Sequence, residues 1–215
     1  MKTTHAVWER ENLGVDAYEI ALDASDTPDL LRQEEARIIA AGAEYIVVKT
    51  PVDCPALLFS MQALGYTFVE TVFHVMIRRD ESHMPASIAR FARGLRVVER
   101  REEADRERIY ALIRRGVFKS DRVSIDPAFG RAKGGNRYAN WLRSMLARGG
   151  FLYEVLSGDK PIGFFVICRK DETTVDPVLM GMYDEEGDRG MGALLHKKTL
   201  DTCFTHDCKR LTSTI

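Results

Sequence analysis

The sequence predicts an α/β (α+β) protein in which a small N-terminal α/β domain precedes a larger domain with a mixed sheet. Strand and helix patterns alternate through the first part of the chain, whereas the second part contains three consecutive strands separated by short turns. The length of 215 residues allows one large domain or two small ones. We therefore place the first domain at residues 1–80, a linker at 81–94 and the second domain at 95–215.

The elements of the first domain follow one another through short connections. Apolar runs predict its strands, and proline and glycine residues mark its helix ends. The expected elements are a strand at 18–22, a helix at 28–41, a strand at 45–48, a helix at 55–64 and a long strand at 67–77. No glycine-rich turn follows any of these strands, so we expect this domain to be a scaffold. A polar break at 80–87 leads into the linker.

The second domain has a different order of elements. Its expected elements are a strand at 95–99, a helix at 102–115, a polar loop at 119–136, a helix at 138–148, strands at 151–156, 162–168 and 175–183, a helix at 193–204 and a strand at 210–215. If the chain ends at Ile215, the last strand has an unpaired edge. We therefore expect either further residues beyond Ile215 or a second copy of the chain, as in a homodimer, to cover this edge.

Composition excludes several classes of partner. The chain has 31 basic and 32 acidic residues and a net charge of -1, which gives no reason to expect nucleic acid or a membrane surface as partner. It has neither a long apolar run nor a secretory signal, so we expect a cytoplasmic protein. The four cysteines form no C-x-x-C pair, and Cys203, His206 and Cys208 are too few ligands for zinc. We expect no metal.

The segment 180–193 is the most informative part of the chain. It runs from an apolar strand through a glycine-rich turn into a helix, with glycines at 187, 190 and 192. Glycine lets the backbone approach an anion closely, and the free N–H groups of a first helical turn supply positive potential. Arg189 adds a full positive charge. The pattern therefore predicts a phosphate-binding turn.

The spacing excludes two common phosphate loops. A Walker loop needs a lysine followed by serine or threonine after its last glycine, and a dinucleotide fold needs Gly-x-Gly-x-x-Gly early in a βαβ unit. Neither pattern is present at 187–192. The turn resembles the acetyl-CoA pyrophosphate loop of GNAT-type N-acetyltransferases, Arg/Gln-x-x-Gly-x-Gly/Ala, although Gly187 stands at the Arg/Gln position. A plain helix start is the alternative. The position of the turn, after the third strand of a meander, favours acyl-CoA binding.

Nearly the whole chain resembles one family, the dTDP-fucosamine (dTDP-4-amino-4,6-dideoxygalactose) N-acetyltransferases, which belong to the GNAT superfamily and serve bacterial polysaccharide biosynthesis. The similar segments are Trp8-Glu-Arg-Glu-Asn12-Leu-Gly14-Val15, Leu64-Gly-Tyr66-x-x-Val69-Glu70, Phe118-x-Ser120-Asp-Arg122, Asp126-Pro127, Tyr138-x-x-Trp141 and Arg189-Gly-Met-Gly192. The resemblance implies transfer of acetyl from acetyl-CoA to the amino group of a nucleotide sugar. It also implies that the GNAT domain is C-terminally incomplete, because the tyrosine proposed as general acid in that family lies beyond the position of Ile215.

The resemblance and the chemistry of the glycine-rich turn together indicate two sets of candidate binding residues. For acetyl-CoA the candidates are Met182, Tyr183, Gly187, Asp188, Arg189, Gly190, Met191, Gly192 and Ala193. Backbone N–H groups of Met182 and Tyr183 are expected to serve the thioester and pantetheine, at a bulge in the strand. For the acceptor the candidates are Lys119, Ser120, Arg122, Tyr138 and Trp141, with cations for a pyrophosphate and rings for stacking.

The catalytic groups stay open at this point. Asp184, Glu185 and Glu186 form a carboxylate run that either supplies a base or is a solvated loop. Tyr183 is either a phenol in the site or a core residue. The favoured function is N-acetyl transfer to a nucleotide-activated amino sugar. The alternatives are a GNAT enzyme for another small amine and a catalytically silent acyl-CoA-binding module.

Overall fold

The computed structural model describes residues 1–81, 83–183 and 190–214. It divides the chain into two compact units, Met1–Glu70 and Thr71–Ile215. This boundary lies ten residues before the one that the sequence analysis placed at residue 80.

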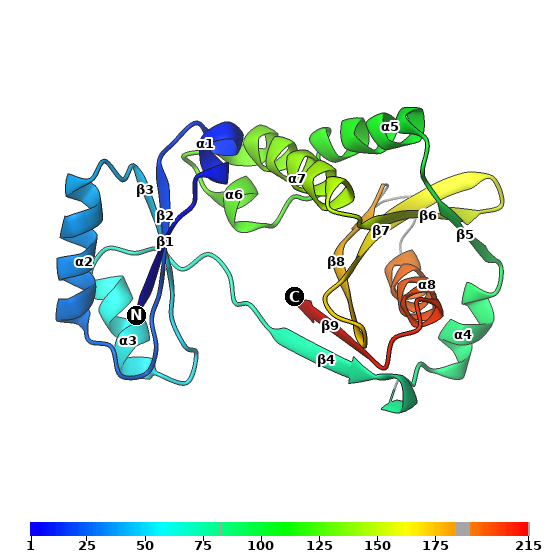
Figure 1. Cartoon of the computed structure of the whole chain (residues 1–215), viewed down its shortest axis with the longest axis horizontal. Coiled ribbons are helices and arrows are strands. Elements are labelled where there is room, and N and C mark those ends of the chain that lie inside the picture. Colours follow the sequence, from blue (N-terminus) through cyan, green and yellow to red (C-terminus); the bar gives the residue numbers. More distant parts are fainter. Residues whose placement is uncertain (82, 184–189, 215) are drawn as a thin grey trace. The chain divides into compact units, whose positions relative to one another are not determined.

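The first unit contains a small sheet with helices packed on it (Figure 1). In chain order its elements are β1 (Lys2–His5), α1 (Trp8–Leu13), β2 (Ala17–Ala21), α2 (Pro28–Ala40), β3 (Tyr45–Lys49) and α3 (Pro55–Ala63). β1 pairs antiparallel with β2, and β2 pairs parallel with β3. The expected strands and helices at 18–63 are confirmed. β1 and α1 were not predicted, because their polar sequences carry no clear apolar period.

The second unit is built on one mixed sheet. Its elements are β4 (His74–Arg78), a 3-10 turn (Arg79–Glu81), α4 (Ala86–Ala92), β5 (Leu95–Glu99), α5 (Glu103–Arg114), α6 (Arg122–Ile125), α7 (Gly130–Ala147), β6 (Phe151–Ser157), β7 (Lys160–Arg169), β8 (Thr174–Met182), α8 (Met191–Thr205) and β9 (Arg210–Thr214). Over the described residues the sheet has six strands in the order β4-β9-β8-β7-β6-β5. The predicted order of elements from 95 onward is confirmed.

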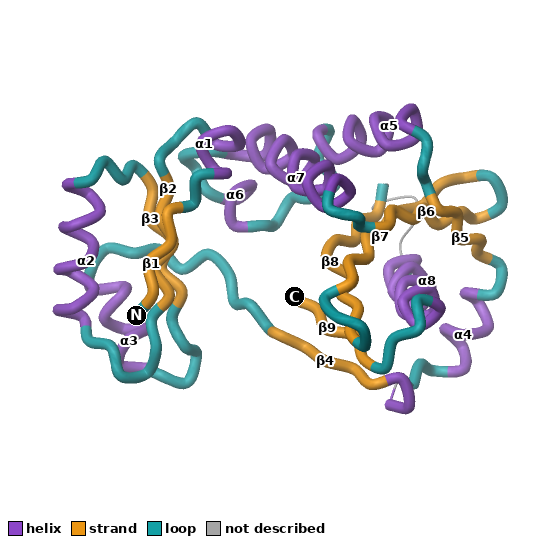
Figure 2. Tube along the Cα trace, in the orientation of Figure 1, coloured by secondary structure: helices purple, strands orange, loops and turns teal. Residues whose placement is uncertain are grey.

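Helices cover both faces of this sheet (Figure 2). On one face α5 and α7 bury a cluster that includes Ile109, Leu142 and Phe164. On the other face α8 buries Leu195 and Leu200 in a second cluster, and α4 packs against α8. Alternation of side chains along the central strands assigns neighbouring residues to opposite clusters, so one sheet has two separate cores.

The prediction of a long strand at 67–77 is wrong for most of this range. Residues 66–73 have no regular structure, and only 74–78 form a strand. This strand, β4, pairs antiparallel with β9 over all five residues of both strands. The unpaired edge expected for 210–215 is therefore occupied by β4 of the same chain. The expected linker at 81–94 contains helix α4, which packs against α8. The prediction of a linker rested on the polar residues of this segment and missed the helix.

The prediction of a polar loop at 119–136 is also wrong, because much of this segment is helical. It contains α6 and the first two turns of α7, which begins at Gly130. Glycines at 134 and 135 disfavour a helix by propensity, but here they allow close packing. A Cβ at Gly134 would lie 2.2 Å from Ser124 Oγ, and a Cβ at Gly135 would lie 2.9 Å from the carbonyl oxygen of Arg114. Tertiary packing overrides the local preference.

Candidate functional site

Two neighbouring parallel strands diverge at the centre of the second unit. β8 and β9 pair only at Thr174 with Arg210 and at Val175 with Leu211, although β8 continues to Met182. Figure 1 shows β8 and β9 separating beyond this point. Backbone groups on this edge of β8 therefore have no ladder partner on β9 after the first two pairs.

A bulge lies in β8 where the strands separate. Leu179 pairs with Val166 and Pro177 pairs with Ile167, so Val178 is the extra residue on β8. Pro177 has no N–H to donate to a ladder, and a bulge redirects the backbone groups around it. The bulge that the sequence analysis expected before the glycine-rich turn is therefore present.

The backbone N–H groups of Met182 and Tyr183, the two candidate residues at the end of β8, differ in their hydrogen bonding. The N–H of Tyr183 donates to the carbonyl oxygen of Ile162 at 3.0 Å. The expectation that this N–H is offered to a ligand is therefore wrong, because the ladder with β7 extends one residue past β8. Hydrogen-bonding direction alternates along a strand, so the N–H of Met182 is directed to the opposite edge, on the side of β9. The role of Met182 as a backbone donor stays a prediction.

Helix α8 begins directly beyond the turn. Gly190 is its N-cap, with φ of 82°, and no side chain caps this end in the described residues. Among the described residues, a Cβ at Gly190 or Gly192 would meet no atom within 4 Å, and the first-turn positions 192 and 193 are exposed. The first-turn N–H groups of an α-helix have no intrahelical partner, so this helix start offers donors to an anion. Gly187, Asp188 and Arg189 lie outside the described residues, as do Asp184, Glu185 and Glu186.

An ionic cluster around a buried glutamate holds the end of β8 in place. Glu154 on β6 is 0% exposed. Its carboxylate accepts hydrogen bonds from Arg100 Nε at 2.9 Å, from Arg108 Nη2 at 2.8 Å and from the hydroxyl of Tyr183 at 2.8 Å. Asp105 lies 3.3 Å from Arg100 and 3.7 Å from Arg108. Two cations thus face two carboxylates, and the cluster is neutral as a whole.

This cluster decides the role of Tyr183. Burial and the negative charge of Glu154 raise the pKa of the Tyr183 phenol, so it stays protonated. Its proton is donated to Glu154, and its ring stacks on Phe164 at 5.9 Å. Tyr183 therefore anchors β8. Sequence analysis missed Glu154, although a glutamate within the apolar run Phe151-Leu-Tyr-Glu-Val-Leu156 was a visible signal.

The candidate acceptor residues do not share one environment. Tyr138 packs on Phe118 with ring centroids 4.1 Å apart, within the core under α7. Trp141 is 36% exposed and lines a cavity of about 330 Å³ together with Val178 of the bulge. Arg122 is 8% exposed in α6. The loop position that the sequence analysis gave it is wrong, because Asp121 caps a helical turn there.

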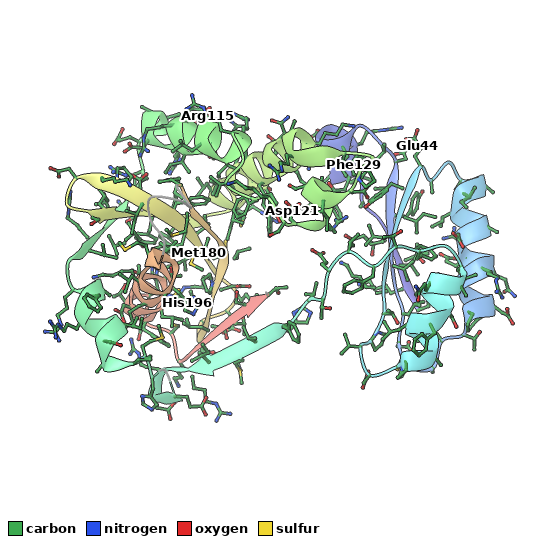
Figure 3. The ribbon with its side chains drawn as sticks, turned by 180° about the vertical axis from the view of Figure 1, so that it is seen from behind. Glu44, Arg115, Asp121, Phe129, Met180 and His196 are labelled. Atoms are coloured by element: carbon green, nitrogen blue, oxygen red, sulfur yellow. The ribbon has the colours of Figure 1, made fainter. Side chains whose placement is uncertain are left out.

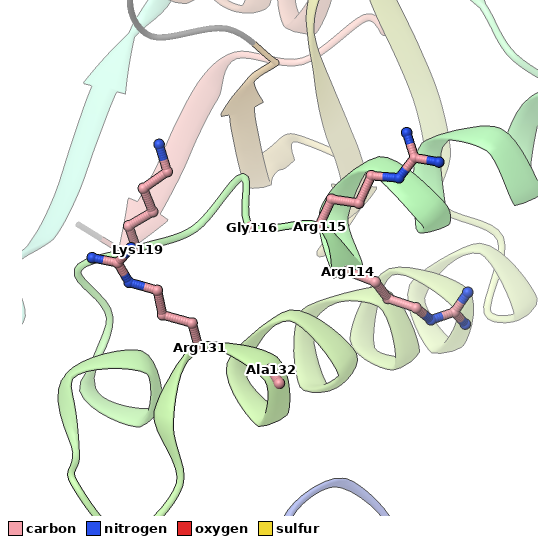
Figure 4. A pocket seen from close by; sticks show the side chains of 6 residues that line it. All are labelled: Arg114, Arg115, Gly116, Lys119, Arg131 and Ala132. Carbon is pink, nitrogen blue, oxygen red and sulfur yellow. The ribbon is translucent and has the colours of Figure 1, made fainter.

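Lys119 and Ser120 are exposed in the segment between α5 and α6. Lys119 lines a second cavity, of about 250 Å³, together with Arg114, Arg115, Gly116, Arg131 and Ala132 (Figure 4). The structure thus brings Lys119 together with three arginines that the sequence analysis did not nominate. Figure 3 shows Arg115 at the end of α5 and Asp121 at the start of α6, on either side of this segment.

Other site types have no support in the described residues. Among residues 1–81, 83–183 and 190–214, no group of three or more His, Cys, Asp or Glu side chains is placed to hold a metal ion. No described helix is long and apolar enough to cross a membrane. His196 on α8 is exposed.

Comparison with known proteins rests on structure alone, because no family model and no curated protein matches the chain. A GCN5-related N-acetyltransferase from Sphaerobacter thermophilus matches with a TM-score of 0.55 and 13% identity, over 86% of this chain and 57% of that protein. A GCN5-related N-acetyltransferase from Kribbella flavida matches with a TM-score of 0.52 and 12% identity, over 93% of this chain and 71% of that protein. These matches show that the chain has the fold of GNAT acetyltransferases.

A functionally unknown conserved protein from Staphylococcus epidermidis also matches, with a TM-score of 0.53 and 12% identity over 93% of this chain. At 12–13% identity, these likenesses concern the fold and leave the acceptor open.

Proposed function

We propose that this protein is a GNAT-type N-acyltransferase that moves acetyl from acetyl-CoA to the amino group of a small molecule. The divergence of β8 from β9 directly before the open start of α8 carries this proposal. An extended thioester fits between two such strands, where the N–H of Met182 faces the separation. A diphosphate fits the uncapped helix start from Gly190 to Ala193.

The chemistry requires little from side chains. A neutral amine attacks the thioester carbonyl, the carbon–sulfur bond breaks, an amide forms, and the proton lost by the amine balances the proton gained by the thiolate. Backbone N–H groups on the open edge of β8 stabilise the oxyanion. The carboxylates at 184–186 stay the hypothesis for a base, and no general acid is assigned.

The acceptor is proposed at two levels. Any small amine is compatible with the fold. A nucleotide-activated amino deoxysugar is supported by the resemblance of the sequence segments and by the basic surroundings of Lys119. Residues that would touch such a sugar include Ser120 and the exposed ring of Trp141. A homodimer and a silent acyl-CoA-binding module stay alternative predictions.

Calorimetry with CoA tests the cofactor site. Gly192→Val suits this test, because a Cβ at residue 192 would meet no described atom within 4 Å and this residue lies within α8. Gly190→Val is less suitable, because the left-handed backbone at Gly190 strains any other residue. We expect Gly192→Val to weaken CoA binding by about tenfold or more, since the isopropyl group blocks the approach of the diphosphate.

The matched control is Ala86→Val, which places the same valine side chain at an exposed first-turn position of α4. This variant should bind CoA as the unmodified protein does. Unchanged affinity in a folded Gly192→Val variant would remove the cofactor site from α8. Release of free CoA thiol from acetyl-CoA in the presence of amines separates an enzyme from a silent binding module.

A further inference from the structure

A cavity of about 330 Å³ lies where the end of α7 meets the bulge of β8 in the second unit. Together with the glycines that follow α7, side chains from the end of α7, the end of β7 and the bulge line it: Trp141, Met145, Arg148, Cys168, Arg169 and Val178. We call this site the bulge cavity. Three elements thus supply an apolar surface, a thiol and two cations to one place.

One wall of the bulge cavity is continuous with the hydrophobic core under α7. Met145 is 2% exposed and belongs to that core, and Val178 packs against it. Trp141, one turn before Met145, is 36% exposed and lines the cavity. An apolar ring placed against this wall would remove apolar area from water and gain contact with the indole. The wall therefore favours a ligand with an aromatic or other apolar group.

The two arginines of the bulge cavity have no acidic partner among the described residues. Arg148 Nε donates to the carbonyl oxygen of Ser144 at 3.2 Å, and Arg169 donates to the carbonyl oxygens of Glu172 at 3.1 Å and of His206. These are backbone acceptors, so neither positive charge is neutralised by an ion pair. Guanidinium groups match carboxylates in geometry as well as in charge. The two cations therefore favour a ligand that carries an anionic group.

The bulge cavity adjoins the strand that is proposed to hold the thioester. β8 pairs with β9 only as far as Val175, and Val178 follows in the part of β8 that has left β9. A ligand in the cavity thus lies beside the start of the separation, on the face of the sheet that α5 and α7 cover. The proposed diphosphate site at the start of α8 belongs to the other face. The two ligands can therefore be bound together.

We propose that the bulge cavity binds the acceptor, and that the acceptor is an amine bearing both a carboxylate and an apolar ring, as an aromatic amino acid does. This inference rests on the proposed acetyl transfer and narrows its small amine to a class other than nucleotide sugars. The ring packs on Trp141 and the carboxylate pairs with Arg148, which leaves the amino group for the thioester. The volume is near the lower limit of small-molecule sites, roughly 300 Å³, and suits a molecule of one or two rings.

Protection of Cys168 from alkylation tests the cavity without requiring catalysis. Cys168 is half-buried and lines the cavity, and burial raises the pKa of its thiol, so iodoacetamide should label it slowly. Phenylalanine or tryptophan in large excess over its Kd should slow this labelling about tenfold or more, since only the unoccupied fraction reacts. Cys54, also half-buried but in the first unit, is the internal reference and should be labelled at an unchanged rate. Absence of protection by both amino acids, or equal protection at Cys54, would overturn the proposal.

Two further comparisons separate the parts of the ligand. Alanine lacks the ring and 2-phenylethylamine lacks the carboxylate, so each should need an about tenfold or higher concentration than phenylalanine to protect Cys168. Arg148→Gln should weaken protection by phenylalanine about tenfold, because a charge-assisted contact is lost. The control is Arg90→Gln on α4 in the same unit, which should leave protection unchanged; both arginines are exposed, so both variants should fold. Equal protection by alanine and phenylalanine, or equal behaviour of the two variants, would contradict the proposal.

The remaining alternatives are decided by competition and kinetics. Tighter protection of Cys168 by dTDP than by either aromatic amino acid would overturn the proposal and assign the cavity to a nucleotide sugar. With acetyl-CoA present, Arg148→Gln should raise the KM for phenylalanine and leave the KM for acetyl-CoA unchanged. The CoA affinity of Gly192→Val reports on the proposed function separately. Absence of Cys168 protection with intact CoA binding would therefore remove the acceptor class alone.

Discussion

At the scale of single residues, Glu154 shows how one buried charge depends on partners from distant parts of the chain. A fully buried carboxylate is costly unless it is paired and hydrogen-bonded. Arg100, Arg108 and Tyr183 supply those partners from β5–α5, α5 and the end of β8. The hydrogen bond that Arg108 donates to Glu154 raises the pKa of Arg108. One carboxylate thus joins three segments of the second unit.

We predict that Glu154→Gln destabilises the protein by about 3 kcal/mol, because two arginines lose their main counter-charge in a buried setting. Chemical denaturation gives the change in the free energy of unfolding. Glu107→Gln is the control, since Glu107 pairs with Arg143 at 2.7 Å with both side chains nearly half exposed. A surface pair of this kind contributes about 1 kcal/mol or less. Similar losses in both variants would contradict the structural role given to the cluster.

At the scale of elements, the C-terminal end of α8 is attached to β6 through an aromatic and polar contact. His206 follows α8, and its Nε2 lies 2.8 Å from the hydroxyl of Tyr153. Its ring also contacts Phe151, with centroids 4.8 Å apart. Burial lowers the pKa of His206 below its ordinary value of 6.5, and the positive charge of Arg169 lowers it further. The neutral ring is therefore the form that the fold favours.

The pKa of His206 predicts a pH dependence of stability. Because the folded pKa lies below 6.5, protonation favours the unfolded chain. The contribution is fully present above pH 6.5 and is lost as the pH falls through the folded pKa. The free energy of unfolding should decrease below pH 6.5 in the unmodified protein, and the decrease should be smaller in His206→Gln.

Two comparisons isolate this effect. His196→Gln changes an exposed histidine of the same helix and should keep the pH profile of the unmodified protein. Carboxylates with a pKa lowered to about 2, such as Glu34 and Asp171, lose their contributions at more acidic pH, so the two windows are separate. Identical profiles for His206→Gln and the unmodified protein would exclude the proposed contact as a source of pH sensitivity.

At the scale of the whole molecule, each unit has its own core. Ile20, Leu31 and Ile38 belong to a cluster within residues 1–70, and both clusters of the six-stranded sheet lie within 71–215. Independent cores are the property expected of separate domains. β4 belongs to the second unit through its pairing with β9, although it directly follows the connecting segment 66–73.

We predict that a fragment of residues 71–215 unfolds cooperatively and binds CoA as the full chain does. A fragment of residues 80–215, cut at the boundary expected from sequence, lacks β4. It should be less stable, because β9 then loses the five paired residues on one edge. Denaturation curves and CoA calorimetry of both fragments provide the measurement. Equal stability of the two fragments would show that β4 adds little to the second unit.

The sequence by itself determined the features that depend on short, continuous stretches of residues. Apolar periods and turn residues located the strands at 151–156, 162–168 and 175–183, and glycines marked the open helix start at 190–192. These signals involve residues close together in the chain, so a single sequence carries them. The order of these elements along the chain then indicated the GNAT fold.

Only the tertiary structure decided features that depend on distant partners. Pairing with β9 assigned β4 to the second unit, and packing against Ser124 and Arg114 made a helix of a segment whose glycines disfavour one. The partners of Glu154 likewise join residues far apart in sequence. Local propensity is worth about 1 kcal/mol per residue or less, whereas burial and pairing contribute more. Where the two disagree, tertiary contacts therefore determine the structure.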